Sequence, residues 1–94
     1  MIKVFKGNDK EYFEWLKSHK KGYILNSDVN ETKYFLHYST CHHITDQSIK
    51  KKSGAYTEKN YIKIYADKIE ELKTHYKDNI YFKDNCNHCK HCNP

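Results

Sequence analysis

Cys86-Asn-His-Cys-Lys-His-Cys-Asn-Pro94 ends the sequence, and His37-Tyr-Ser-Thr-Cys41 lies halfway back along it. The first stretch contains a C-x2-C couple, Cys89 and Cys92, and the second contains an H-x3-C couple, His37 and Cys41. Two such couples, each on a tight turn, are the usual way in which proteins assemble a tetrahedral zinc site. We therefore predict one Zn2+ ion held by these four side chains, whose binding energy decides whether so small a chain folds.

Two other ligand sets are compatible with the spacing. Cys86 stands three residues before Cys89, so these two residues could form the second couple, and Cys41 could join all three terminal cysteines in an all-cysteine site. The simplest interpretation of Cys86 is a free or partly buried thiol. Four histidines flank the predicted ligands and could substitute for them, although polar turns commonly carry solvated histidines: His42, His43, His88 and His91.

Composition predicts a single domain over residues 1–94 with a modest core. The chain is 37% hydrophobic with a mean hydropathy of −1.05, and nine Tyr, four Phe and one Trp supply much of its apolar volume. The first residues lack the apolar run of a secretory signal, and the sequence has no apolar stretch long enough for a membrane span. We therefore expect a cytoplasmic protein whose thiols bind metal rather than form disulfides.

The pattern of apolar and polar residues predicts a small α+β fold. Residues 2–6, 23–26, 32–38 and 61–65 read as strands, and residues 45–60 read as a polar loop. Asn8 with Glu11 predicts the start of one helix, and Asp67 with Glu70 predicts the start of another. The predicted order is β-α-β-β-loop-β-α-knuckle, with two helices on a small, mostly antiparallel sheet.

The metal-ligand pattern resembles the zinc-binding domain of the Ada-type methylphosphotriester repair proteins. Those proteins carry a C-x3-C couple and then a C-K-R-C-x-P ending, which His37, Cys41 and Cys89-Lys-His-Cys92-Asn-Pro94 approach. The resemblance implies zinc and contact with the DNA backbone. His37 occupies the position of the family's methyl-accepting cysteine, and a zinc-bound imidazole has no free lone pair to accept a methyl group. A looser resemblance, to a small zinc module of restriction-type bacterial proteins, rests on the segments at 22–26 and 61–64, on Leu36-His37 and on the final C-x2-C-x-P.

Nothing in the sequence predicts a catalytic residue. Three Cys and one His would fill the zinc tetrahedron, whereas a catalytic zinc keeps one position open and has a base close by. The nearest acids in the sequence, Asp46 and Asp84, each lie five residues from a predicted ligand cysteine. We therefore expect a protein without enzymatic activity that works by binding.

The basic character of the chain suggests a polyanionic partner. The formal net charge is +5, and all seventeen basic residues are lysines, which suit the backbone of nucleic acid better than its bases. One cluster of basic and aromatic residues is the predicted contact region: Lys50, Lys51, Lys52, Tyr56, Lys59 and Lys63. One alternative is a soluble lysine loop without a ligand. The other is a protein adaptor or inhibitor, of the kind that phages encode, which uses a basic face against an acidic protein surface.

Overall fold

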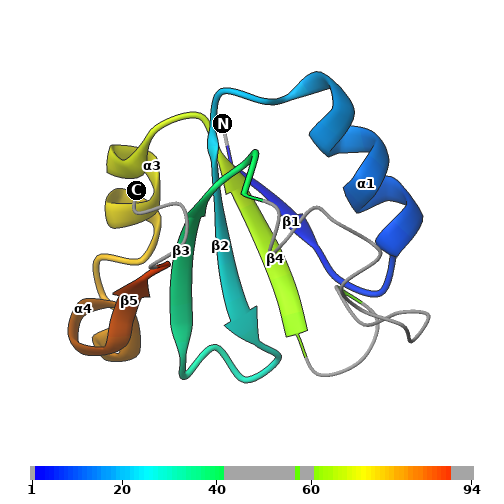
Figure 1. Cartoon of the computed structure of the whole chain (residues 1–94). Helices are drawn as coiled ribbons and strands as arrows, with labels where there is room; N and C mark the ends of the chain where they lie inside the picture. Colours follow the sequence, from blue (N-terminus) through cyan, green and yellow to red (C-terminus); the bar gives the residue numbers. More distant parts are fainter. Residues whose placement is uncertain (1, 42–56, 58–60, 90–94) are drawn as a thin grey trace.

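The computed structural model describes residues 2–41, 57 and 61–89 of the chain. Figure 1 shows a sheet with helices on both sides. The elements in chain order are β1 (Ile2–Phe5), α1 (Asp9–Ser18), β2 (Tyr23–Asp28), β3 (Tyr34–Tyr38), β4 (Tyr61–Ala66), α3 (Ile69–His75), α4 (Ile80–Asn85) and β5 (Cys86–His88). The predicted small α+β class is confirmed.

The five strands form one mixed sheet in the order β1-β4-β2-β3-β5. The three pairings among the first four strands are antiparallel, with Ile64 of β4 opposite Val4 on one side and Leu25 on the other. The last pairing is parallel: Tyr34 of β3 lies beside Cys86 of β5, and Leu36 lies beside His88. This short parallel edge brings the end of β5 next to the middle of the chain.

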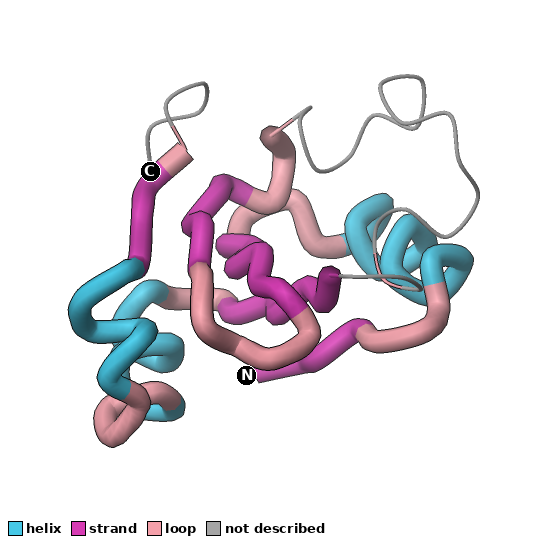
Figure 2. Tube along the Cα trace, turned by 90° about the horizontal axis from the view of Figure 1, so that it is seen from below, coloured by secondary structure: helices cyan, strands magenta, loops and turns pink. Residues whose placement is uncertain are grey.

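Helices lie on both faces of the sheet, as the view from below in Figure 2 shows, and each face carries a buried core. Since strand side chains alternate between faces, each strand contributes to two cores. One core packs Tyr12 and Leu16 of α1 against residues of the sheet that include Phe5 and Tyr65. The other core packs Leu72 of α3 and the adjacent Tyr76 against the opposite face.

The helix starts follow the sequence signals in one case and depart from them in the other. Asn8 caps α1 as predicted, because its side-chain oxygen accepts a hydrogen bond from the Glu11 N–H at 3.0 Å. The prediction that Asp67 caps the second helix is wrong: α3 begins one residue later, with Lys68 at the cap position. Asp67 instead accepts a hydrogen bond from the Tyr65 hydroxyl at 2.7 Å.

Lys63 is the clearest departure from the sequence prediction. It does point away from Ile62 and Ile64, but that face is also covered, and Lys63 is only 1% exposed. Its ammonium donates to the Asn26 side-chain oxygen at 2.7 Å and lies 5.7 Å from the centre of the Tyr61 ring. The assignment of Lys63 to a solvent-facing nucleic-acid patch is therefore wrong, because β4 is a central strand of a sheet covered on both faces.

Two further elements were not predicted, α4 and β5. Asn79 caps α4 by accepting a hydrogen bond from the Phe82 N–H at 3.1 Å, and the helix leads directly into β5. The terminal segment is thus partly a sheet strand rather than a free knuckle. Among the described residues, none of the helices has the length and apolar character needed to cross a membrane.

Candidate metal centre

His37 lies on β3, on the sheet face that is covered by α1. Its neighbours in the strand, Leu36 and Tyr38, point to the other face by the alternation of the strand. The pairing of β3 with β2 sets His37 opposite Ile24, which belongs to the core beneath α1. The imidazole is therefore held by a strand that is paired on both of its sides, and it is 6% exposed.

Backbone hydrogen bonds bring Cys41 back toward this histidine. The Ser39 N–H donates to the Gly22 carbonyl at 2.9 Å, and the Cys41 N–H donates to the Tyr38 carbonyl at 3.0 Å. The second bond closes a tight turn directly after β3. A three-residue spacing between His37 and Cys41 thus places both side chains at the same end of the strand, as the H-x3-C pattern predicts.

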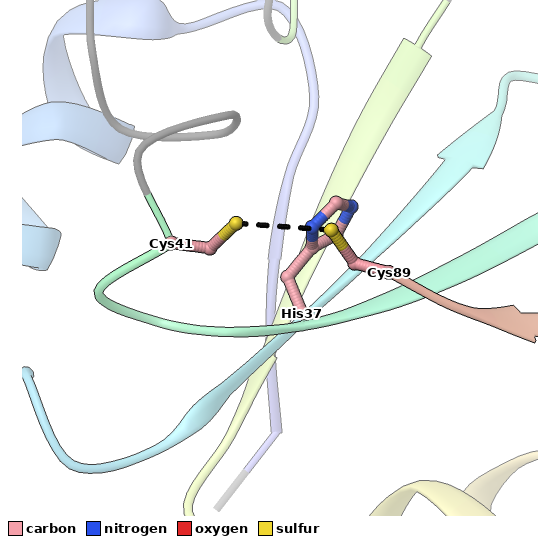
Figure 3. Close-up of side chains that lie close together, drawn as sticks. All are labelled: His37, Cys41 and Cys89. Carbon is pink, nitrogen blue, oxygen red and sulfur yellow. Dashed lines mark hydrogen bonds between the residues drawn. The ribbon is translucent and has the colours of Figure 1, made fainter. Parts of the chain in front are cut away.

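Cys89 reaches the same place from the other end of the chain. Its N–H donates to the Leu36 carbonyl at 2.8 Å, which extends the parallel pairing of β3 and β5 by one residue. Figure 3 shows the result: the side chains of His37, Cys41 and Cys89 converge from β3, from the turn after it and from the end of β5. The parallel pairing of β3 with β5 therefore brings Cys89 to His37 and Cys41.

The ligand atoms of the three residues lie close enough together to hold a metal ion. One ligand atom from each residue lies within 4.8 Å of the others, and the Sγ atoms of Cys41 and Cys89 are 3.9 Å apart. Two sulfurs at about 2.3 Å from one tetrahedral Zn2+ ion would be separated by about 3.8 Å. The spacing of the two sulfurs matches that value.

The surroundings favour a bound cation over a pair of bare thiolates. Cys41 and Cys89 are 4% and 6% exposed, and both belong to the apolar core beneath α1. Charged thiolates are costly in such a place unless a cation compensates them. None of the three described cysteines, Cys41, Cys86 and Cys89, forms a disulfide bond. The donor set of two thiols and one imidazole is typical of zinc.

The structure separates Cys86 from the cluster. Cys86 packs against the core beneath α3 and α4, on the opposite face of the sheet from Cys41 and Cys89. The alternation of β5 puts His88 on that same opposite face, where it lines a pocket with Cys86. Burial raises the pKa of the Cys86 thiol, so this side chain stays neutral at physiological pH. Cys92, the predicted fourth ligand, and His42, His43 and His91 lie outside the described residues.

Most of the predicted nucleic-acid patch also lies outside the described residues. This holds for Lys50, Lys51, Lys52, Tyr56 and Lys59. Thr57 is described, and it is buried against the start of α1, where its hydroxyl and its N–H both donate to the Asp9 carboxylate at 2.6 Å. No sequence pattern predicted this contact, because two polar residues 48 positions apart carry no local signal.

Comparison of this chain with known protein families, with curated proteins and with solved structures found no match. Among the described residues, one group of side chains has the makeup and closeness of a metal site, and it is His37, Cys41 and Cys89.

Proposed function

We propose that this chain is a zinc-stabilised binding module without enzymatic activity, and that it binds nucleic acid through the phosphate backbone. The observation that supports the metal is the convergence of His37, Cys41 and Cys89 in a buried cluster whose sulfurs are 3.9 Å apart. Cys92 completes the proposed ligand set, since a C-x2-C couple presents two thiolates to one ion. Zinc bound there joins β3 to the end of β5 and contributes its binding energy to folding.

Elemental analysis of the purified protein tests the metal directly. We expect about one equivalent of zinc per chain, and chelation should unfold the protein. Replacement by Co2+ gives a second readout, because thiolate ligands produce charge-transfer absorption and tetrahedral coordination produces intense visible bands. A folded protein without bound metal, unaffected by chelators, would contradict the zinc proposal.

The charge of the chain supports the proposed partner. The net charge is +5, and lysines on α1 and beyond its end are exposed, among them Lys10, Lys17, Lys20 and Lys21. Lysine ammonium groups neutralise phosphates without reading base edges, so affinity should vary little with sequence. Titration of the zinc-loaded protein with random duplex DNA at several salt concentrations tests this, since each neutralised phosphate contributes about −0.9 to the slope of log affinity against log salt.

A protein partner with an acidic surface is the second candidate, favoured by the same net charge of +5. Both candidates predict binding that weakens with salt, so the identity of the partner must be tested separately. Absence of affinity for duplex and for single strands at low salt, together with recovery of one stoichiometric acidic protein, would reject nucleic acid in favour of this alternative.

A further inference from the structure

A pocket of about 530 Å³ lies on the face of the sheet opposite the metal cluster, between α3, α4 and β5. Its size falls within the range of small-molecule sites in proteins. The pocket shares no residue with the candidate metal centre, although Cys86 and His88 of β5 line it and Cys89 follows directly.

The inner wall of this pocket is apolar and firmly packed. It is formed by Leu36, Leu72, Tyr76 and Phe82, and the rings of Tyr76 and Phe82 stack with their centres 5.2 Å apart. The Tyr76 hydroxyl donates to the Glu31 carboxylate at 3.2 Å, so the ring is held at its far end as well. The Cys86 thiol adds a neutral surface to this wall. An apolar ligand would therefore meet a preformed cavity.

The rim of the pocket is cationic. Three lysines line it from different segments: Lys73 from α3, Lys77 from the turn after α3, and Lys83 from α4. All three are exposed, and none of the described residues that line the pocket is acidic. An apolar wall edged by three cations is complementary to a molecule with an apolar body and one anionic group.

We propose that this pocket binds a small organic acid, a carboxylate with a hydrocarbon chain, whose chain lies against Ile69 and Phe82 and whose carboxylate faces the three lysines. This ligand class is separate from the nucleic-acid proposal, because it depends on apolar surface that a phosphate backbone would not use. It also differs from the metal site, because its residues lie on the other face of the sheet.

Calorimetric titration of the zinc-loaded chain with octanoate and with 1-octanol tests the proposal. Both probes offer the same hydrocarbon chain, and only octanoate carries a charge at neutral pH. We expect octanoate to bind roughly tenfold more tightly than octanol, as three partly screened cations near one carboxylate would produce. Amide chemical shifts should change around α3, α4 and β5.

Matched variants locate the charge. The variant Lys73→Met/Lys77→Met/Lys83→Met keeps apolar side chains of similar length and loses the three charges. Its affinity for octanoate should therefore fall about tenfold, to the level of its affinity for octanol. The control Lys10→Met/Lys17→Met/Lys20→Met removes the same charge from the α1 side and should bind octanoate like the wild type. Cys86→Met should fill part of the pocket and weaken both probes. Two results would overturn the proposal: no binding of octanoate to the wild type, or equal affinity of the two triple variants for octanoate.

Discussion

Loss of the Cys41 thiolate should remove zinc and destabilise the whole chain. Apparent zinc binding energies of structural sites in small peptides are about 10–16 kcal/mol at neutral pH. Shared evenly over four ligands, this is roughly 2.5–4 kcal/mol for one thiolate, which corresponds to a 100- to 1,000-fold loss of zinc affinity. Because small domains have only about 5–15 kcal/mol of stability, Cys41→Ser should leave much of the protein unfolded or insoluble.

Cys86→Ser is the matched control for this prediction. It is the same chemical change in the same chain, but it lies on the opposite sheet face from Cys41 and Cys89. We expect it to keep one equivalent of zinc and to lose stability only through its own packing, by about 1 kcal/mol. Competition with a chromophoric chelator and thermal unfolding would measure both quantities.

The reverse pattern of metal loss would place the metal site elsewhere in the chain. If Cys86→Ser lost its metal while Cys41→Ser or Cys89→Ser kept it, the buried cluster beneath α1 would not be the zinc site. The same titration applied to Cys92→Ser tests the ligand that lies outside the described residues. A zinc affinity equal to that of the wild type would show that another residue fills the fourth position.

Four further predictions follow from particular residues. Incubation with DNA that carries methylphosphotriesters should leave the intact mass unchanged, because a zinc-bound imidazole of His37 would have no free lone pair to accept a methyl group. A methyl group gained on His37 or Cys41 would contradict this. Lys63→Met should not change the slope of log duplex affinity against log salt, because Lys63 is buried. Lys50→Ser/Lys51→Ser/Lys52→Ser should make that slope shallower by roughly two to three units, because three phosphate contacts are lost. Burial, followed by the charge of Glu31, raises the pKa of Tyr34 to about 12 from 10.0. The stability that Tyr34 contributes is therefore complete below pH 10 and is lost as the pH rises toward about 12. In alkaline unfolding measurements Tyr34→Phe should reduce this loss of stability, while Tyr65 and Tyr76, whose pKa values burial also raises, keep their own shares of it. The hydrogen bond from the Tyr65 hydroxyl lowers the pKa of the Asp67 carboxyl below its usual 3.8. The stability that this ionised carboxylate contributes is therefore present above pH 3.8 and is lost as the pH falls below it. Tyr65→Phe should raise the Asp67 pKa, as measured by a carbon-detected NMR titration.

The residues of the candidate metal site were predictable because zinc ligands occur in couples with a short, recognisable spacing in the sequence. Spacings of two or three residues put both members of a couple on one turn, whatever the rest of the fold does. His37 and Cys41 meet in this way through the turn after β3, and Cys89 joins them. Asn8 was predictable for the same reason, since a helix cap depends on residues three positions apart.

The placement of Lys63 and of β5 depends on distant parts of the chain. Alternation in β4 correctly separated Lys63 from Ile62 and Ile64, but only the packing of α1 on one face and of α3 on the other shows that both faces are covered. The β3–β5 pairing joins residues about 50 positions apart through three residue pairs, too few to produce a periodic pattern. The spacing of the cysteines alone therefore could not predict that Cys86 and Cys89 lie on different faces of the sheet.

The two proposed sites depend on the same short strand. Along β5 and the residue after it, Cys86 and His88 face the pocket while Cys89 faces the metal cluster. β5 is an edge strand that pairs only with β3 in the described sheet, so its three residue pairs hold it weakly. A zinc ion that joins Cys89 to His37 would fix the end of this strand, and with it the wall that Cys86 contributes to the pocket. The metal would then stabilise both cores, because the strand it anchors belongs to both.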